Sequence, residues 1–484
     1  MARTKREGMF IEGLAADTAD GVPRYRHVYR RIREGILSGA LQADTPLPST
    51  RTIAVEARIS RKSAEEAYAQ LESEGYVVRR SGSGTFVAGV ALPAKARQVR
   101  VSGSRTLSAR GRSAVAAMSC VEPTVVRAFA AGLPALDAFP YQAWQRLLAR
   151  HARQLDAKAL VYGDPAGSLP LREAIAAYLT GSRGVQCEPS QVIVLSSSQQ
   201  ALDLVARLFL DPGDEVWLED PGYYGARAAL TSAGARIVPV PVDAQGLDVA
   251  RGEALAPQAR LAYVTPSNQY PLGITMSLDR RLALLDWARR GNAWIVEDDY
   301  DSEFRYDGRP VASIQGLDSS GRVLYVGTFT KTLYPSLRLG YLVAPRDLAE
   351  RIVVARTQID GHPSTFLQRV VADFMAEGQF GAHVRRMRAL YHARRDVLVA
   401  SIARHLGDRV VLGNVDAGMR ATVFVEGDDR ELSARAMARG IEAPPLSRYY
   451  LGTAKRSGLV LGYAGLSPAA IRKGVQLLAG QTLS

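Results

Sequence analysis

The fold of this chain is constrained most by seven short apolar runs in its C-terminal part. They occupy residues 192–195, 216–218, 237–240, 261–264, 293–296, 323–326 and 340–343. Most of the intervals between them span about 20–30 residues and carry a helical pattern, as in a parallel sheet whose strands are joined by helices. The interval between the last two runs is too short for a helical crossover, so one strand is expected to be antiparallel. The sequence therefore predicts an α/β domain built on a largely parallel sheet.

Residues 24–88 show a different pattern, in which helical periodicity is followed by two β-like segments. Apolar side chains recur at three- and four-residue intervals over residues 25–36, which indicates an amphipathic helix. Ser49 and Ser60 are candidate N-caps of two further helices, and Gly75 follows the second. The segments 76–80 and 85–88 flank a glycine-rich turn and predict a hairpin. Three helices and a hairpin in this order predict a winged helix-turn-helix.

The net charge of +13 is concentrated near the N-terminus. Residues 1–115 hold 20 Lys and Arg against 11 Asp and Glu, and no acidic residue lies between Glu74 and Glu122. Residues 89–122 are rich in Ala, Ser, Gly and Arg and lack aromatic residues, so we expect a basic flexible linker there. This charge favours a polyanionic partner, either nucleic acid or an anionic membrane surface.

Other features of the sequence exclude several classes of protein. No apolar run reaches the roughly 18 residues that a membrane span needs. Glu7 and Glu12 interrupt the N-terminal segment, which is unlike a signal peptide. The two cysteines cannot form a disulfide framework, and the absence of CxxC and HxxxH motifs argues against a metal site. We therefore expect a cytoplasmic protein without a metal.

The N-terminal unit carries side chains suited to DNA. A helix that begins after Ser60 would present Ser60, Arg61, Lys62 and Ser63 from its first turn, where recognition helices reach bases and phosphates. The arginines of the hairpin, Arg80 among them, suit a minor groove, and its glycine-rich tip can approach a backbone closely. A solvated helix end is the alternative interpretation, but the caps, the apolar face, the glycines and the charge together favour DNA binding.

A second set of polar residues follows the predicted strands of the C-terminal part. Residues 297–301 are acidic and follow one run, Lys331 follows the next, and Arg338 comes seven residues later. In open α/β sheets the ligand lies at the carboxyl ends of the strands. A lysine, a carboxylate and an arginine there fit pyridoxal 5'-phosphate (PLP): the lysine forms a Schiff base, the carboxylate meets the ring nitrogen and the arginine meets the phosphate.

Residues between another strand and helix complete this predicted site. Ser197, Ser198 and Gln199 would offer amides and hydroxyls to the phosphate, and Tyr223 would stack on the ring. A lysine after a strand is more often a solvated surface residue, and residues 297–301 alone would suit a magnesium ion. The order and spacing of the whole set favour the cofactor.

The N-terminal unit resembles the GntR type of winged helix. The resemblance rests on residues 46–51, 59–63, 67–71 and 74–76. It implies that the DNA contacts fall on Arg51, Ser60, Arg61, Lys62, Ser63 and Gly82. Glu65 stands where some relatives carry an arginine, so no base preference is carried over.

The C-terminal part resembles fold-type I aminotransferases, and the whole chain resembles the MocR group of GntR regulators. The matching segments are residues 162–167, 219–223, 265–273, 297–304 and 327–341. The resemblance implies a winged helix over residues 23–88, the linker over 89–122, and an aminotransferase-like domain over 123–484 with a mainly parallel sheet and a small C-terminal α+β subdomain. The cofactor-binding residues that it implies, with those predicted above, are Lys331, Asp298 at the ring nitrogen, Tyr300 at the phenolic oxygen, Arg338, Thr328, Tyr223, Ser197, Ser198, Gln199, and Tyr162 from the partner of a homodimer.

Several residues depart from the aminotransferase pattern. Ser197 replaces a usual glycine, Asn268 and Arg420 replace usual histidines, and Tyr270 replaces a ring-contacting asparagine. Residues 457–463 are mostly apolar where many aminotransferases have an arginine that clamps the substrate carboxylate. Losing that clamp removes much of the energy that positions an amino acid for proton transfer. Arg420, Arg448 and Arg227 are the candidates to bind an effector in its place.

We consider three functions for this chain. The favoured one is a PLP-dependent transcriptional regulator whose binding to an operator in double-stranded DNA responds to PLP or to its Schiff base with an amino compound. It would not be an enzyme, apart from a partial transaminase half-reaction. The alternatives are a working PLP-dependent aminotransferase with an accessory DNA-binding domain, and a PLP-storage or scaffold protein. The resemblance also implies a homodimer, with domain-swapped winged helices as one arrangement.

Overall fold

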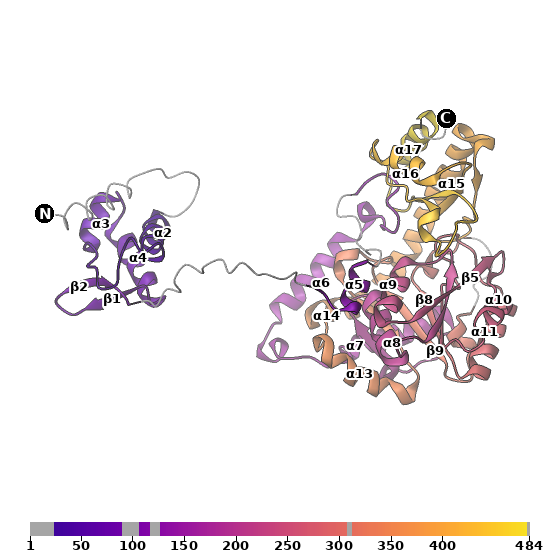
Figure 1. The fold of residues 1–484 in the computed structure, drawn as a ribbon, viewed down its shortest axis with the longest axis horizontal. Coiled ribbons are helices and arrows are strands. Elements are labelled where there is room, and N and C mark those ends of the chain that lie inside the picture. Colours follow the sequence, from indigo (N-terminus) through magenta and orange to yellow (C-terminus); the bar gives the residue numbers. More distant parts are fainter. Residues whose placement is uncertain (1–23, 90–105, 117–125, 307–311, 482–484) are drawn as a thin grey trace. The chain divides into compact units, whose positions relative to one another are not determined.

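The computed structural model describes residues 24–89, 106–116, 126–306 and 312–481. Contacts divide the chain into two units at the boundary between Thr106 and Leu107. Figure 1 shows the elements of each unit. Residue 23 and most of the predicted linker, residues 90–105 and 117–122, lie outside the described residues.

The N-terminal unit is a winged helix-turn-helix, as predicted. Its elements are α2 (Arg24–Leu37), α3 (Thr50–Glu56), α4 (Arg61–Ser73), β1 (Val77–Arg80) and β2 (Gly84–Val87). The Ser49 hydroxyl accepts a hydrogen bond from the Thr52 amide at 3.1 Å, and the Ser60 hydroxyl accepts one from the Ser63 amide at 3.0 Å. Both predicted N-caps are therefore confirmed. Apolar side chains of the three helices and both strands form a single core, with Ile32 and Leu71 fully buried.

One helix lies inside the predicted linker and was not expected. It is α5 (Ala109–Ala116), which belongs to the C-terminal unit and contacts α9 (Tyr224–Ala233). The described part of residues 89–122 is thus partly helical rather than wholly flexible. Its small side chains and Arg110 and Arg112 carry no amphipathic stripe, and none of its residues is buried, so the sequence offered no periodic signal.

The C-terminal unit is built on an eight-stranded sheet. Its spatial order is β3 (Val192–Leu195), β10 (Gly340–Val343), β9 (Val323–Thr328), β8 (Trp294–Asp299), β7 (Leu261–Val264), β4 (Glu215–Asp220), β5 (Arg236–Asp243) and β6 (Gly246–Leu247). β5, β4, β7, β8 and β9 are parallel, and β10 runs antiparallel to both of its neighbours. All seven predicted strands are present, and the antiparallel one is where the short interval placed it.

Helices cover both faces of this sheet (Figure 1). One face packs on α8 (Ser198–Phe209), α9 and α13 (Arg346–Asp360). The other packs on α6 (Tyr141–Arg153), α7 (Leu169–Arg183), α10 (Val249–Leu255), α11 (Leu278–Gly291), α12 (Ile314–Leu317) and α14 (Thr365–Ala376). Successive residues of a strand point to opposite faces. In β8, Val296 therefore lies in the core on the α8 side, and Ile295 lies in the core on the α11 side.

A smaller α+β subdomain follows the sheet. It contains β11 (Val411–Leu412), β12 (Arg420–Phe424) and β13 (Gly458–Gly462) in one antiparallel sheet, with α16 (Asp429–Met437) and α17 (Pro468–Gln481). The long helix α15 (Gln379–His405) contributes Phe380 and Val384 to the core of the main sheet and Tyr391 and Leu398 to the core of the subdomain. The subdomain expected from the resemblance is present, and α15 joins it to the sheet.

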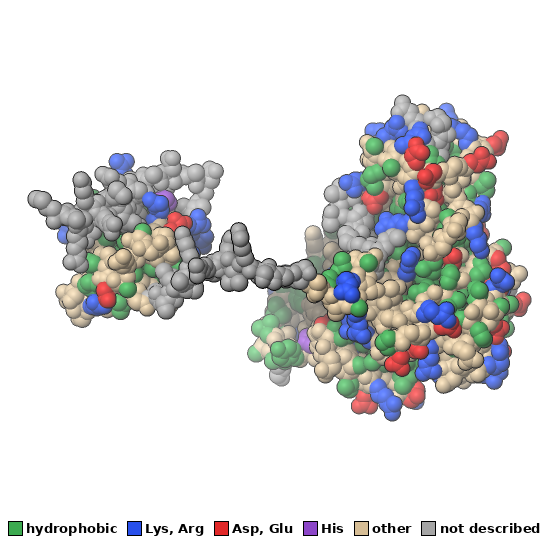
Figure 2. Space-filling view, viewed as in Figure 1, with side chains coloured by type: hydrophobic (Ala, Val, Ile, Leu, Met, Phe, Trp, Pro, Cys, Tyr) green, Lys and Arg blue, Asp and Glu red, His purple; other side chains and the backbone are tan. Residues whose placement is uncertain are grey.

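Two surface properties bear on partners. In the part of the chain that the structure describes, no helix is both long and apolar enough to span a membrane. Lys and Arg side chains are interspersed with Asp and Glu on the visible face of the C-terminal unit (Figure 2). This agrees with the near balance of 41 basic and 37 acidic residues beyond residue 115.

We predict that Leu71→Ala unfolds the N-terminal unit selectively. Leu71 is fully buried, and truncation of a buried leucine costs about 2–5 kcal/mol, most of the stability of so small a unit. Hydrogen exchange should show loss of protection in α2 and α4, while the amides of β7, β8 and β9 keep theirs. Equal loss of protection in both units would contradict the division.

Candidate functional site

The carboxyl ends of β4, β7, β8 and β9 meet at one edge of the sheet, and the predicted site residues follow them. Tyr223 precedes α9 after β4, Asn268 and Tyr270 follow β7, and Lys331 follows β9 by three residues. Asp298 lies at the end of β8, on the face that packs on α8, and is within electrostatic range of Lys331. The topology therefore brings the predicted lysine and carboxylate together.

Asp298 has one satisfied and one unsatisfied carboxylate oxygen. It is only 4% exposed, and its Oδ2 accepts a hydrogen bond from the Tyr263 hydroxyl at 2.7 Å. Its Oδ1 is buried and has no hydrogen-bond partner. Burial raises the pKa of Asp298 to about 7, against the opposing effects of the Tyr263 hydrogen bond and the Lys331 charge. A buried acceptor without a donor is costly, and a protonated ring nitrogen would satisfy it.

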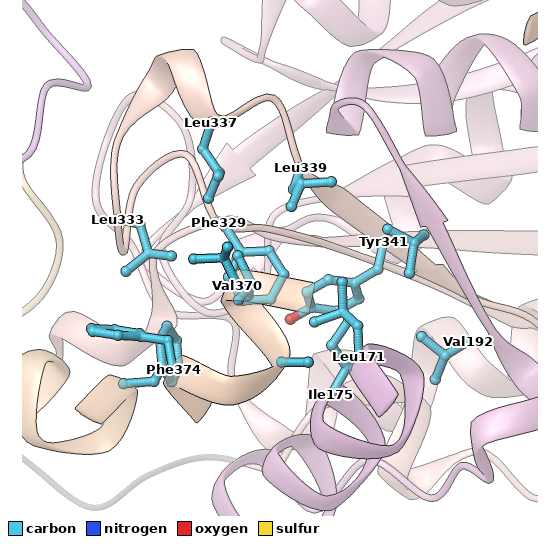
Figure 3. Close-up of a cluster of buried hydrophobic side chains, with 14 of the residues drawn as sticks. Leu171, Ile175, Val192, Phe329, Leu333, Leu337, Leu339, Tyr341, Val370 and Phe374 are labelled. Carbon is cyan, nitrogen blue, oxygen red and sulfur yellow. The ribbon is translucent and has the colours of Figure 1, made fainter. Parts of the chain in front are cut away.

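The segment that carries Lys331 is fixed by apolar side chains on either side of it. Phe329, Leu333, Leu337 and Leu339 enter the core formed by α7, α14 and the adjacent strands (Figure 3). This anchoring holds the backbone at Lys331, whose Nζ donates a hydrogen bond to the carbonyl of Gly132 at 3.1 Å. The contact with Gly132 has no signal in the sequence, because 199 residues separate the two.

Arg338 ends the same segment in an unusual conformation. Its φ of 53° lies in the left-handed region, and its side chain is exposed. A non-glycine residue in this conformation is uncommon and suggests that the side chain is needed there. Thr328, the last residue of β9, is buried and its hydroxyl accepts a hydrogen bond from the Thr330 amide at 3.1 Å.

The N-terminus of α8 lies beside the start of β10. Ser197 is its N-cap, and the Ser197 hydroxyl accepts a hydrogen bond from the Gln200 amide at 3.1 Å. A Cβ on Gly340 would come within 3.2 Å of the Ser198 nitrogen, so the strand and the helix end are in close contact. The Gln199 side chain donates to the carbonyl of Gly225 at 2.9 Å, which ties α8 to α9. Serine in place of the usual glycine thus caps a helix end that is suited to an anion.

Arg420 is part of a buried polar cluster at the start of β12. Its guanidinium donates to the Tyr300 hydroxyl and lies 3.7 Å from the Asp301 carboxylate. It also covers the rings of Tyr270 and Tyr300, at 4.1 and 5.0 Å from their centroids. Asn268 donates from Nδ2 to both oxygens of Asp301. The charge of Arg420 is therefore balanced within the protein, and its main effect is to position Tyr300.

Four tyrosines surround this part of the site. The ring of Tyr223 lies 5.3 Å from Tyr224 and 5.4 Å from Tyr270, and Tyr270 lies 5.4 Å from Tyr449. Arg448 covers the ring of Tyr224 at 5.2 Å. The three arginines that are predicted to bind an effector thus lie in two different places. Arg420 lies against Tyr270, whereas Arg448 lies beside the first turn of α9, the helix that also carries Arg227. Tyr224 and Tyr449 were missed, although each directly follows a residue that was predicted.

Tyr162 is not brought to the site of its own chain. It is 94% exposed and contacts the His362 ring edge-on at 6.0 Å. The preceding Leu160 and Val161 are also exposed, at 75% and 66%. An exposed apolar segment of this kind is typical of a protein–protein interface.

The predicted DNA-binding residues lie on the N-terminal unit. Arg51 is exposed on α3, and Ser60, Arg61, Lys62 and Ser63 form the first turn of α4. The Arg61 Nε lies 3.1 Å from the Glu65 carboxylate, and Arg80 pairs with Asp44. Gly82 has a φ of 74°, and nothing lies within 4 Å of the position that a Cβ would take. At Gly82 the tip of the hairpin therefore carries no side chain and faces open space.

We predict that Asp298→Asn changes the pH dependence of stability in the cofactor-free protein. The folded pKa of Asp298, about 7, lies above its unfolded value of about 4, so the folded state binds this proton more tightly. The free energy of unfolding of the wild type should therefore fall, relative to the variant, as the pH rises from about 4 to 7. Each unit of pKa shift corresponds to about 1.4 kcal/mol. Denaturant unfolding of the C-terminal unit measures this difference, and a pH-independent difference would contradict the assignment.

Two family models match the chain. The model for aminotransferase class I and II covers residues 129–478, and the model for bacterial regulatory proteins of the gntR family covers residues 24–87. The first corresponds to the sheet and its subdomain, and the second to the winged helix.

Proteins with both units match over nearly the full length. The chain is 45% identical to the probable rhizopine catabolism regulatory protein MocR of Rhizobium meliloti, over 96% of this chain and 95% of that protein. It is 31% identical to the pyridoxine biosynthesis regulator PdxR of Corynebacterium glutamicum, over 90% of each. A solved structure, the multiple substrate aminotransferase of Thermococcus profundus, is 30% identical and covers 78% of this chain and 95% of its own, with a TM-score of 0.69. The chain therefore belongs to the MocR-type transcriptional regulators of the GntR family, in which a winged helix-turn-helix is joined to an aminotransferase-like domain.

Proposed function

We propose that this regulator binds operator DNA through its winged helix and that PLP, or the product of PLP with an amino compound, sets the affinity for that DNA. The observation that carries the cofactor part is the buried, unpartnered Oδ1 of Asp298 within electrostatic range of Lys331. A ring nitrogen and an aldehyde on one planar ligand satisfy both groups.

The residues around this pair support the same ligand. Lys331 would form the covalent bond, Tyr223 would cover the ring and Tyr300 would meet the phenolic oxygen. The first turn of α8, with Thr328 and the exposed Arg338, would hold the phosphate at a helix N-terminus. PLP supplies an aldehyde that condenses with amines and a ring that withdraws electrons.

The candidate carboxylate-binding groups favour a sensor over an enzyme. β13 is buried throughout and has an apolar sequence where an aminotransferase would hold a substrate carboxylate. Arg420 donates to Tyr300 and lies near Asp301, and its buried Nε has no hydrogen-bond partner, so Arg420, Arg227 and Arg448 all stay candidates to bind an effector. The name of the Corynebacterium regulator refers to pyridoxine biosynthesis, which makes PLP itself one candidate effector. An amino compound that reacts with PLP is the other.

The contact between α5 and α9 supports a route by which the cofactor site affects the segment before the C-terminal unit. α5 contacts α9, and α9 begins at the tyrosines beside the cofactor site. A change at that site can thus reach the segment that leads to the winged helix. The exposed residues 160–162 support a homodimer in which Tyr162 reaches the partner's cofactor. We place the protein in the cytoplasm, where its DNA target lies.

We predict that PLP changes operator affinity only when Lys331 is present. With DNA fragments selected in vitro by the full-length protein, adding PLP at fixed salt should change the dissociation constant by about 5- to 150-fold, the usual range of coupling between two sites. Lys331→Ala should abolish this change and the visible absorbance of bound PLP. Lys473→Ala, which removes an exposed lysine of α17, is the matched control. Equal affinities of the wild type with and without PLP would refute the cofactor response.

We predict that Arg61→Ala weakens operator binding through lost base or phosphate contacts. One good contact of this type is worth about 1–3 kcal/mol, or about 5- to 150-fold in affinity. Glu65→Gln should have the opposite effect on random DNA, because it frees Arg61 from an exposed carboxylate at 3.1 Å and removes a negative charge. Fluorescence anisotropy with selected and random duplexes at several salt concentrations measures both effects. A protein without any preference for the selected duplex would instead support PLP storage.

The alternative function, an aminotransferase with an accessory DNA-binding domain, makes a different prediction. It requires sustained transfer of amino groups to a keto acid, at roughly 1 s⁻¹ or faster, the range of ordinary enzymes. We expect at most a single slow half-reaction. Measuring keto-acid formation over many equivalents of protein separates the two outcomes.

A further inference from the structure

A cavity lies on the face of the sheet opposite the proposed cofactor site. It has a volume of about 290 Å³, and its lining includes Arg183 at the end of α7, Glu303 and Arg305 after β8, and Arg388 on α15. Asp298 and Asp299 are consecutive residues of β8 and point to opposite faces of the sheet. Asp299 is bound by Arg183, so the cavity lies on the face opposite the one that carries Asp298. None of the predicted cofactor-binding residues lines it.

Positive charge exceeds negative charge in this cavity. Four guanidinium groups and one carboxylate, that of Glu303, line it. Arg183 is neutralised by Asp299 at 2.8 Å, and Arg281 is fully buried and donates only to backbone carbonyls. Burial lowers the pKa of Arg281, the charges of Glu297 and Asp299 raise it, and the charges of Arg183 and Arg305 lower it. Because guanidinium groups outnumber carboxylates in the lining, the cavity favours an anion.

In two of these arginines, only part of the guanidinium group makes hydrogen bonds with the protein. Arg305 donates from Nη2 to the Thr275 hydroxyl at 3.0 Å, and Arg388 donates from Nε to the carbonyl of Glu303 at 2.8 Å. Each bond fixes the direction of a group that has further N–H donors. Two planar, oriented guanidinium groups suit the bidentate recognition of a carboxylate or a phosphate.

Glu303 adds a hydrogen-bond acceptor to the cavity. Its Oε1 accepts a hydrogen bond from the Tyr178 hydroxyl at 3.1 Å, whereas its Oε2 is buried and has no partner. A buried acceptor without a donor costs about 1–3 kcal/mol, and a hydroxyl group of a ligand would satisfy it. The cavity thus offers cations for an acid group and an acceptor for a hydroxyl group.

We propose that this cavity is a second ligand site, which binds a small organic dianion that carries a hydroxyl group. Carboxylate and phosphate forms share this chemistry. The site would also bear on the arrangement of the domain, because Arg305 follows β8 in the sheet-bearing part, whereas Arg388 lies on the helix that joins the sheet to the C-terminal subdomain. A ligand held by both arginines would fix the position of α15 and, through β8, affect the cofactor site on the other face. Coupling of this type is reciprocal between the two ligands.

Calorimetric titration of the full-length protein in a tertiary-amine buffer, which cannot condense with PLP, with chloride as the only anion tests the proposal. The probes are 2-hydroxyglutarate and glutarate, which differ only in the hydroxyl group, and glycerol 3-phosphate and propyl phosphate, which differ only in the two hydroxyl groups. None of them contains an amine, so none can condense with PLP. We expect each hydroxylated probe to bind about 5-fold or more tightly than its partner, which corresponds to one additional hydrogen bond. The tighter of the two hydroxylated probes identifies the acid group.

Substitutions of the lining residues test whether the probes bind in this cavity. Arg305→Gln and Arg388→Gln should each weaken the binding of the better probe by about 10-fold or more, and Glu303→Gln should reduce the preference for the hydroxylated probe. Arg385→Gln removes an exposed arginine of α15 that does not line the cavity and should have no effect. Arg388 is itself exposed, so its variant is expected to fold normally. The proposal is overturned if no probe binds below about 10 mM, or if both arginine variants bind as the wild type does.

The outcome is independent of the proposed cofactor response. Lys331→Ala should retain the binding of the dianion, because Lys331 does not line the cavity. Loss of the dianion in this variant would show that the probes bind at the cofactor site, which would also overturn the proposal. A wild type that binds the dianion but shows no effect of PLP on DNA would refute the cofactor response alone.

Discussion

The carboxyl end of β8 and the residues after it carry five carboxylates, and their neutralisation organises the C-terminal unit. Buried charges are tolerated only when they are paired, hydrogen-bonded or protonated. Glu297 accepts the amides of Ile314 and Gln315 at the start of α12, Asp299 pairs with Arg183, and Asp301 pairs with Asn268 and Arg420. Asp298, Asp299 and Glu303 each keep one unpartnered buried oxygen. Those of Asp298 and Glu303 lie at the two places, one on each face of the sheet, where we propose that a ligand binds.

The sequence alone was sufficient to predict the features that depend on the pattern of neighbouring residues. The seven strands, the antiparallel β10 and the caps Ser49 and Ser60 follow from apolar runs, interval lengths and helix-start residues, each of which is read within a few neighbouring positions. The nearness of Lys331 and Asp298 also follows from the sequence pattern, because the carboxyl ends of neighbouring parallel strands must meet.

The remaining features depend on contacts between distant residues. Tyr263 binds Asp298, Gly132 binds Lys331, and Arg420 comes from a separate subdomain to neutralise Asp301. No periodicity or motif links such positions, so the sequence could nominate Arg420 as an effector ligand but could not show that it is already paired. The cavity behind β8 was missed for the same reason, since its arginines come from α7, α15 and the segment after β8. The helix α5 has no apolar stripe, so the sequence predicts a linker there and not a helix.

The position of Arg420 suggests how an aminotransferase fold serves as a sensor. In an enzyme, binding energy accelerates a reaction only when the interaction is stronger in the transition state than in the ground state. The guanidinium of Arg420 lies over the rings of Tyr270 and Tyr300 and 3.7 Å from Asp301, and its Nε has no partner, so most of its interactions are already made within the protein and little of it can strengthen as a reaction proceeds. It can, however, make the position of Tyr300 depend on β12 and thus on the C-terminal subdomain. A ligand that contacts Tyr300 then has different affinities for different subdomain positions, which is what a regulator requires.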